Sequence, residues 1–489
     1  MSIVKKYIYL LVTVVCLASC DGFLNMQPTD SANADGAIAT THDAQVAING
    51  IMRAMTADTY YGRDMMMYAD AKGGDMTIIS NGNGLSDFYT FDHSPVRGSY
   101  SSFWSHIYYC IMQVNNLLES INHLEAEGKN GFESYKGQAL TLRALFYFDL
   151  VRLYGLPYNY LSSGLGVPRV MQTLGASAQP ARATVAQNYA DICRDLQAAE
   201  LLLADDIVPK HGYVNYYANL ALQARVALYM EDYELALEKA EKIIVNQMFY
   251  RLYTNDEWAK SWSQQFGDES ILELCIDSEN DLGTSSLGYY HLSGELAKTV
   301  VARFVASDYY LQRLAEDPTD VRWSVMADDE KSMVGARRLG ACLKYIGGPD
   351  MQGDGKPTMT ATNIKIIRLS EVYLIAAEAA LQSGDKGKAA DYLNFIRSRA
   401  PMLQPATADN ITLDMILNER SKELYGEGQR FFDRIRCNQT IEYNDDFQNV
   451  PVTRRGKTID RTYYGIVLPI SQDELNANPA MSNQQNLGY

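Results

Sequence analysis

The carboxylates that come closest to a catalytic arrangement are three glutamates spaced four residues apart, Glu419, Glu423 and Glu427. Hydrolysis of a glycosidic bond needs two carboxylates that face each other across the bond, about 5–9.5 Å apart. Glutamates at i and i+4 of a helix instead share one face and point the same way. Arginines are interleaved with them or come after them, namely Arg420, Arg430, Arg434 and Arg436. The spacing therefore predicts a structural charge network and no catalytic residues.

The stretch DMQGDG at 350–355 comes nearest to a metal site. It has oxygen ligands at calcium-loop positions 1, 3 and 5 and Gly355 at position 6, but position 12 is Ala361 where a bidentate glutamate is needed. An ordinary glycine-rich turn is favoured. The sequence also contains no HExxH, GxSxG, P-loop or GxGxxG pattern. We therefore expect no metal, no cofactor and no enzymatic activity.

The first 20 residues carry the chemistry of membrane attachment. Lys5 and Lys6 precede an apolar run at 7–17, which has about half the length that a membrane-spanning helix needs. The run ends in Leu17-Ala18-Ser19-Cys20, the lipobox pattern of bacterial lipoproteins. We expect a signal peptide at 1–19, lipid on Cys20 and a polar tether at 20–36. The alternative is an ordinary signal peptide that happens to contain a cysteine.

Composition and charge narrow the class of ligand. The formal net charge of −16 argues against nucleic acid as a partner. Tyrosine is abundant, with 34 residues against 14 phenylalanines. Since tyrosine combines a flat apolar ring with a polar tip, it suits ligands that are partly apolar and partly hydroxylated.

Hydrophobic periodicity predicts a mainly α-helical chain. Helical spacing is present at 43–57, and one apolar stripe runs from Ile107 to Ile121. The segment 137–155 is apolar almost all round and ends at Gly155, which predicts a helix buried between others.

Two segments resemble each other at the spacing of a tetratricopeptide helix pair. Residues 224–244 align with 377–397, so that Ala224 matches Ala377 and Asp232 matches Asp385. The two repeats are not in tandem, which indicates helix pairs that carry large inserts. The alternative is two unrelated helical hairpins that share common residues.

Two long segments, 58–103 and 255–360, are rich in Gly, Asp, Asn, Ser and aromatic residues and show little helical periodicity. Irregular segments on a rigid scaffold commonly carry binding sites. We therefore expect a single domain at 37–489, in which tetratricopeptide-like helix pairs form an α-superhelical scaffold with a loop-rich ligand-binding face.

Six motifs occur along the chain in the order that is typical of one known family. The first motif is the lipobox together with CDGFLNMQP, which begins at its cysteine. The second is the expected helix at 103–121, which matches the family at Trp104, Tyr108, Ile111, Asn115 and Leu118. Three further segments are similar to helices of the family, namely LRALFYFDLVRLYGLPY (142–158), RLSEVYLIAAEAAL (368–381) and NERSKELYGEGQRFFDRIR (418–436). The segment at 467–489 contains Leu-Pro-Ile and Asn478-Pro479 and is similar to the family's terminus. In these motifs the chain resembles the SusD/RagB family of outer-membrane nutrient-binding lipoproteins of the Bacteroidota.

The resemblance implies a surface-exposed protein, anchored to the outer membrane by lipid, that binds a glycan. It also implies a partner, a SusC-like TonB-dependent transporter to which the captured oligosaccharide is delivered. Two other functions stay open. One is a tetratricopeptide-like adaptor that binds only protein or peptide, and the other is a polysaccharide-degrading enzyme.

The candidate ligand-binding residues are chosen by side-chain chemistry and by position in the two loop-rich segments. A sugar ring is held by flat aromatic rings on its C–H faces and by amide, carboxylate, imidazole or guanidinium groups at its hydroxyls. The expected contacts are Asp75, Asn81, Asn83, Asp87, Tyr89, His93, Arg97, Tyr100, Tyr289, Tyr290 and Trp323.

The lipid anchor gives the first testable prediction. Cys20→Ala removes the only thiol that the lipobox places at the cleavage site, so the protein should leave the membrane fraction. Fractionation of cells and subsequent immunoblotting measure this. Retention of the variant in the membrane fraction at the wild-type level would contradict the lipid anchor.

Overall fold

The computed structural model describes residues 38–79, 85–96, 98, 100, 102–175, 177–209, 212–291, 304–330, 337–347, 358, 360–447 and 450–489. The expected signal peptide, Cys20 and the tether lie outside the described residues, as does the stretch 350–355.

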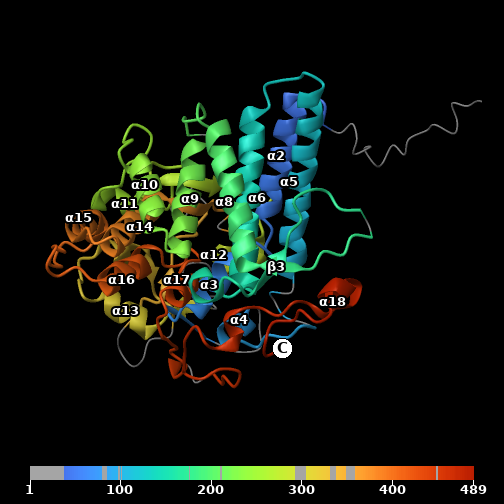
Figure 1. Ribbon diagram of the computed structural model, residues 1–489. Helices are drawn as coiled ribbons and strands as arrows, with labels where there is room; N and C mark the ends of the chain where they lie inside the picture. Colours follow the sequence, from blue (N-terminus) through green and yellow to red (C-terminus); the bar gives the residue numbers. More distant parts are fainter. Residues whose placement is uncertain are drawn as a thin grey trace, which may run out of the picture.

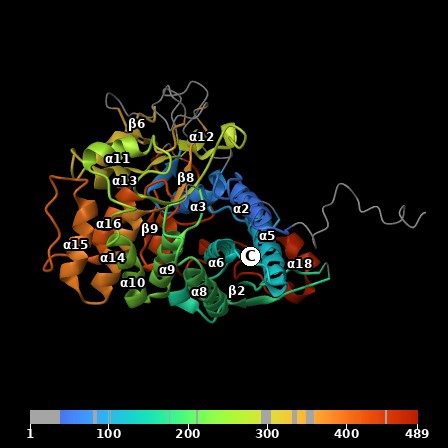
Figure 2. The ribbon, with the colours of Figure 1, turned by 90° about the horizontal axis from the view of Figure 1, so that it is seen from above.

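Long helices dominate the structure (Figure 1). They are α2 (Thr41–Met55), α5 (Ser102–Ala126), α6 (Glu133–Tyr154), α8 (Val185–Leu202), α9 (Tyr216–Met230), α10 (Tyr233–Ile244), α14 (Leu369–Gln382), α15 (Lys386–Arg397) and α16 (Leu413–Glu423). Each of the helices α5, α6, α8, α9, α10, α14 and α15 packs on the next. Figure 2 shows them succeeding one another along a curved line. The prediction of a mainly α-helical scaffold is confirmed.

Helix α6 is the predicted buried helix. From Gly137 to Val151 every residue is buried, because α5 and α8 pack on it and α2 and α9 also contact it. Gly155 forms its C-cap, as the sequence indicates.

The two similar segments form two helical hairpins with the same capping chemistry. Asp232 accepts a hydrogen bond from the Leu235 backbone N–H at the start of α10 (3.2 Å), and Asp385 accepts one from Lys388 at the start of α15 (3.0 Å). Such N-caps satisfy a backbone donor that the helix leaves unpaired. The turns before them use left-handed residues, Glu231 (φ 61°) and Gly384 (φ 89°). The hairpins are consistent with a tetratricopeptide-like scaffold.

Short elements complete the described part of the chain. The helices are α3 (Asp64–Lys72), α4 (Ser86–Thr90), α7 (Tyr158–Leu161), α11 (Asn255–Ser261), α12 (Leu287–His291), α13 (Asp308–Leu314), α17 (Arg430–Arg436) and α18 (Gln472–Ala477), with 3-10 turns η2 (Gly283–Ser285), η3 (Val321–Val325), η6 (Tyr464–Ile466) and η7 (Pro479–Met481). The strands are β1 (Met76–Ile78), β2 (Leu165–Pro168), β3 (Arg182–Thr184), β4 (Ser270–Leu274), β5 (Phe304–Ala306), β6 (Met326–Ala327), β7 (Ala341–Cys342), β8 (Ile364–Arg368), β9 (Ile441–Glu442) and β10 (Thr458–Ile459).

These strands form antiparallel pairs, β1 with β5, β2 with β3, β4 with β8, β6 with β7, and β9 with β10. Met76 lies opposite Ala306 in the first pair, and Leu274 lies opposite Ile364 in the third. The β1–β5 and β4–β8 pairs therefore join segments that are far apart in the sequence. We call the segment 255–360 the insert. In Figure 2 its helices α11, α12 and α13 lie to one side of the curved line of helices.

The segment 58–103 is more ordered than its composition suggests. It contains α3, β1 and α4, and all nine residues of α3 are buried. A helix that is buried on every side has no polar face, so it produces no amphipathic period that a sequence pattern could detect.

A network of buried charges ties the insert to the helices. We call it the glutamate–arginine network, and it consists of Glu269, Glu419, Glu423, Glu427, Arg322, Lys344, Arg368 and Arg399. Arg368 at the end of β8 donates to Glu427 (2.8 Å), to Glu269 (3.1 Å) and to Glu423 (3.2 Å). The three glutamates of the 419–427 segment are at most 5% exposed. The three glutamates form a structural charge network as predicted, but the partners differ from the expected ones. Arg420, Arg430 and Arg436 pair with Asp433, Asp75 and Glu378 instead.

Further cations and anions complete this network. Arg322 of η3 donates to Glu419 (2.6 Å), Arg399 after α15 donates to Glu269 (2.8 Å), and Lys344 after β7 donates to Glu427 (2.7 Å). Burial opposes ionisation of Glu423, but the surrounding cations outweigh burial and lower the pKa of Glu423 to about 2. The carboxylate is therefore charged and paired, which is the condition under which a buried charge is tolerated.

No helix in the described ranges combines the length and the apolar character that crossing a membrane requires.

The network predicts a large loss of stability on removal of one cation. Arg368→Met leaves three buried glutamates without a shared partner, which should lower the free energy of unfolding by about 3–5 kcal/mol. The control is Arg454→Met, because Arg454 pairs with Asp92 at the surface (2.9 Å, 62% and 53% exposed), and this change should cost less than about 1 kcal/mol. Denaturant titrations of both variants measure the difference. Equal losses in the two variants would contradict the role of the network.

Candidate functional site

Three expected ligand contacts, Asn81, Asn83 and Arg97, lie outside the described residues. For the other eight, the structure places some in the interior and others near the surface.

Tyr89 and Tyr100 are interior residues, with exposures of 0% and 2%. The Tyr89 hydroxyl donates to Asp445 (2.9 Å), and the guanidinium of Arg455 lies 4.8 Å from the Tyr89 ring centroid. Tyr100 packs against His93, with ring centroids 5.1 Å apart. The sequence placed both tyrosines on a loop-rich face, but α4 turns Tyr89 into the core. In this conformation neither ring offers a surface to a ligand.

His93 takes part in a chain of hydrogen bonds beneath the same loop. Its Nε2 lies 2.7 Å from the Nζ of Lys72, and its Nδ1 lies 2.7 Å from the hydroxyl of Tyr489. That hydroxyl donates to the Val467 carbonyl (2.9 Å). Burial, assisted by the nearby Lys72, holds the pKa of His93 well below its usual range. His93 is therefore a neutral structural link in this conformation.

Four further candidates, three on the insert and one in α4, range from buried to half-buried. Tyr289 and Trp323 are half-buried, and the Trp323 indole N–H donates to the Asp317 carbonyl (3.3 Å). Tyr290 is 7% exposed and packs against Tyr289 and under Arg63, whose guanidinium lies 5.4 Å from the ring centroid. Asp87, in the first turn of α4, is half-buried. Tyr290 is thus mainly a packing residue, while Tyr289, Trp323 and Asp87 keep some surface.

Asp75 lies at the floor of a recess between helices α13 and α17. The carboxylate is buried and holds three groups, the guanidinium of Arg313, the Nε of Arg430 (2.9 Å) and the hydroxyl of Ser421 (2.5 Å). Burial would raise the pKa of Asp75, but Arg313 and Arg430 lower it below its usual value. Asp75 is therefore an ionised anchor for side chains that line the recess.

We call this cavity the polar recess, and it has a volume of about 350 Å³. Its lining residues are Gly74, Asp75, Tyr309, Gln312, Arg313, Glu316, Arg434 and Glu442. A volume of this size lies within the range of small-molecule sites. The residues come from α13, α17, β9 and the turn before β1, which lie near the lower end of the helices in Figure 1.

Ser307 positions α13 at the recess. Its hydroxyl accepts from the Tyr310 N–H (3.2 Å) and donates to the Gly74 carbonyl (2.8 Å), while its own N–H donates to the Asp75 carbonyl (2.8 Å). The cap thus fixes the helix to the floor of the recess. Tyr310 and Leu314 point into the core, so Tyr309 and Gln312 are left on the open side.

The polar recess combines an aromatic ring with hydrogen-bonding side chains. Tyr309 is half-buried and its hydroxyl donates to Glu442 (3.1 Å), while Gln312 is exposed. Arg434 donates through Nη1 to Gln439 (2.7 Å), and its buried Nε has no hydrogen-bond partner in the described part of the chain. A flat ring, an amide, a carboxylate and a guanidinium donor therefore surround one cavity.

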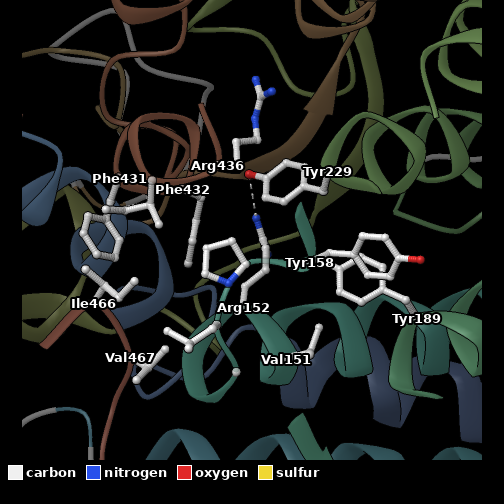
Figure 3. A pocket seen from close by; sticks show the side chains of 14 residues that line it. Val151, Arg152, Tyr158, Tyr189, Tyr229, Phe431, Phe432, Arg436, Ile466 and Val467 are labelled. Atoms are coloured by element: carbon white, nitrogen blue, oxygen red, sulfur yellow. Dashed lines mark hydrogen bonds between the residues drawn. The ribbon is translucent and has the colours of Figure 1, made fainter. Parts of the chain in front are cut away.

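A second cavity is too small for a sugar (Figure 3). Its volume is about 30 Å³, roughly the space of one water molecule. Arg152 lies between the rings of Phe148 and Phe432 (4.2 and 4.3 Å to the centroids) and donates to the Tyr229 hydroxyl (3.4 Å). These contacts indicate a packing role for the cavity walls.

Sequence reasoning missed most of the polar recess. Tyr309, Gln312, Arg313 and Glu316 have the spacing i, i+3, i+4, i+7 of one helix face, which could have been recognised. Arg434 and Glu442 are distant from them in the sequence, and their position depends on tertiary structure.

Among the described residues, no group of three or more His, Cys, Asp or Glu side chains is arranged to hold a metal ion.

The fold and the cavity define a class of protein, a mainly helical scaffold with a polar recess. The chain matches two family models, one described as the SusD family (residues 308–489) and one as starch-binding proteins associating with the outer membrane (residues 23–228). A solved SusD superfamily protein of Bacteroides thetaiotaomicron is similar at 32% identity, with a TM-score of 0.81, and the match covers 92% of this chain and 100% of that one.

Curated relatives agree with this structure. SusD-like protein P38 of Formosa agariphila is 24% identical over 98% of both chains. The starch-binding protein SusD of Bacteroides thetaiotaomicron is 31% identical over 153 residues, which cover 30% of this chain and 26% of the relative. The chain belongs to the SusD family, and the expected resemblance is confirmed.

The placement of Tyr89 leads to a stability prediction. Tyr89→Ala should lower the free energy of unfolding by at least about 3 kcal/mol, because it leaves a cavity in the core and removes the hydroxyl that donates to Asp445. Tyr109→Ala is the matched control, since Tyr109 of α5 is 53% exposed, and it should change stability by no more than about 0.5 kcal/mol. Denaturant titration distinguishes the two variants. A neutral Tyr89→Ala would argue for a surface role of this ring.

Proposed function

We propose that this chain is a lipid-anchored, surface-exposed protein that captures an oligosaccharide and delivers it to a SusC-like TonB-dependent outer-membrane transporter. In this proposal the protein binds its ligand without chemical conversion. The polar recess is the observation that carries the proposal, because it joins an aromatic ring to hydroxyl-binding groups in a cavity of suitable size.

The recess can contact both parts of a sugar. The Tyr309 ring can lie against the C–H face of a sugar ring, while Gln312 and the Arg434 Nε–H can bind its hydroxyls. Asp75 holds Arg313 in place before a ligand arrives. Preorganised side chains reduce the entropy that is lost on binding, so a small site of this kind can still be selective.

The family descriptions support the cellular context of the proposal. One matching family is described by starch binding and by association with the outer membrane. The expected lipid at Cys20 would provide that association. A purely protein-binding adaptor would share the scaffold but would not need a polar recess of this composition.

Catalysis has little support in the arrangement of carboxylates. Glu419, Glu423 and Glu427 are buried and paired with cations, so they do not face a common open cavity. A panel of polysaccharides should therefore release no reducing sugar on incubation with the protein.

Loss of binding in recess variants tests the glycan-binding proposal. Tyr309→Ala combined with Gln312→Ala should weaken oligosaccharide binding at least about tenfold, equivalent to about 1.4 kcal/mol, and should leave thermal stability nearly unchanged. Calorimetric titration with the best ligand from a glycan screen measures the affinity. Tyr109→Ala serves as the control and should bind like the wild type. Unchanged affinity of the double variant would show that the sugar binds elsewhere, and binding of peptides alone would favour the adaptor.

Copurification tests the proposed partner. Purification of the intact protein from solubilised outer membranes should also yield a large β-barrel protein in a fixed ratio. Its repeated absence, under conditions that preserve other membrane complexes, would contradict the transporter partner.

A further inference from the structure

A groove on the insert, separate from the polar recess, contains a buried donor without a partner among the described residues. The groove has a volume of about 210 Å³, and we call it the Trp262 groove. Its lining residues are Ala259, Lys260, Trp262, Ser263, Ser324, Val325, Leu343 and Ile346. It shares none of these residues with the polar recess. Helix α11, which leads into it, lies on the insert side in Figure 2.

Trp262 differs from its neighbour Trp258 in the use of its indole N–H. The two rings pack edge to face, with centroids 5.9 Å apart. The Trp258 N–H donates to Glu423 (3.1 Å), whereas the Trp262 Nε1 is buried and has no hydrogen-bond partner within the described ranges. Trp262 as a whole is 5% exposed. An unpaired buried donor costs free energy that a ligand acceptor can recover.

Three cations surround the Trp262 ring. Lys344, Arg368 and Lys365 lie 4.4, 5.0 and 5.5 Å from the ring centroid. Lys344 and Arg368 are fixed by their bonds to Glu427 in the glutamate–arginine network. Positive charge next to an indole draws electron density from the ring, which makes its N–H a stronger donor. A strong donor favours an acceptor of high charge density.

The rim of the groove adds one cation, which also favours an anion, and two hydroxyl oxygens that can accept from sugar hydroxyls. Lys260 is exposed and forms no ion pair within the part of the chain that the structure describes. The hydroxyls of Ser263 and Ser324 donate to the carbonyls of Lys260 (2.8 Å) and Val321 (2.5 Å), so their oxygens remain able to accept. Val325, Leu343 and Ile346 supply an apolar wall.

We propose that the Trp262 groove is a second ligand subsite that binds an anionic oxygen, a carboxylate or a sulfate, carried by an acidic sugar residue. The Trp262 N–H and the Lys260 ammonium bind the anionic oxygen, the serine oxygens accept from sugar hydroxyls, and the apolar wall contacts the ring. A hydrogen bond to a charged acceptor is stronger than one to a neutral hydroxyl, which gives preference for acidic over neutral sugars. This inference rests on the proposed glycan-binding function and adds a ligand class to it.

Indole resonances give a direct test. The chain has four tryptophans, so the ¹⁵N–¹H spectrum of the full protein should contain four indole signals, and the Trp262→Phe variant identifies the one from Trp262. On titration with tri-galacturonate, or with a sulfated trisaccharide if sulfate is the source of the anion, the Trp262 signal should shift saturably. The Trp258 signal should not move, because its N–H is already bonded to Glu423. No shift with either acidic probe, or an equal shift with a neutral trisaccharide, would overturn the proposal.

Affinities of matched variants complete the test. Trp262→Phe keeps a ring in the groove and removes only the N–H donor, so it should weaken binding of the acidic trisaccharide at least about tenfold. Lys260→Met should weaken the same binding several-fold. Lys129→Met, at an exposed lysine beyond α5, should have no effect. Wild-type affinity of Trp262→Phe for acidic sugars would overturn this subsite. If a neutral sugar still binds and its binding depends on Tyr309, the proposed function remains intact. Absence of all sugar binding would overturn both.

Discussion

The structure depends on a requirement for pairing of buried charges. A guanidinium or carboxylate removed from water is tolerated only where a counter-charge and hydrogen bonds replace its hydration. In this chain Arg368 can meet that requirement only if β8, the end of α16 and the residue before β4 come together. Arg322 brings η3 to Glu423, and Lys344 brings the segment after β7 to Glu427. Because Arg368 pairs with the same two glutamates, the network fixes the insert against the helical scaffold.

The two cavities that we propose as ligand sites lie next to buried charges. Asp75 holds Arg313, Arg430 and Ser421 beneath the polar recess, and Ser307 fixes α13 to the backbone of the same turn. In the Trp262 groove, the cations that neutralise Glu427 also surround the tryptophan ring. The helical hairpins supply a rigid frame, while the ion pairs determine which side chains remain at the surface. Membership of the SusD family is consistent with a scaffold that carries different ligand sites on similar helices.

Much of the scaffold could be predicted from the sequence, because its signals are local. The all-round apolar pattern of α6 and the matched aspartate caps of α10 and α15 depend on residues close in the chain. The cations that pair with Glu419, Glu423 and Glu427 come from distant segments and could not be predicted. Helix α3 gave no signal because it is buried on all sides. Tyr89 was expected at the surface, since nothing in the residues around it reveals that Asp445 and Arg455 enclose it. Of the ligand contacts expected from the sequence, Asp75 alone lines the polar recess in the described part of the chain. The helical spacing of Tyr309, Gln312 and Arg313 was available in the sequence, but their meeting with Arg434 requires the tertiary structure.

A sugar held between α13 and α17, as we propose, would be visible in a crystal structure with a bound oligosaccharide. The protein would be crystallised with the ligand of highest affinity from a glycan screen. We expect a sugar ring against Tyr309, with one hydroxyl within hydrogen-bond distance of the Arg434 Nε. A fully occupied oligosaccharide elsewhere on the surface, with water alone between Tyr309 and Arg434, would contradict it.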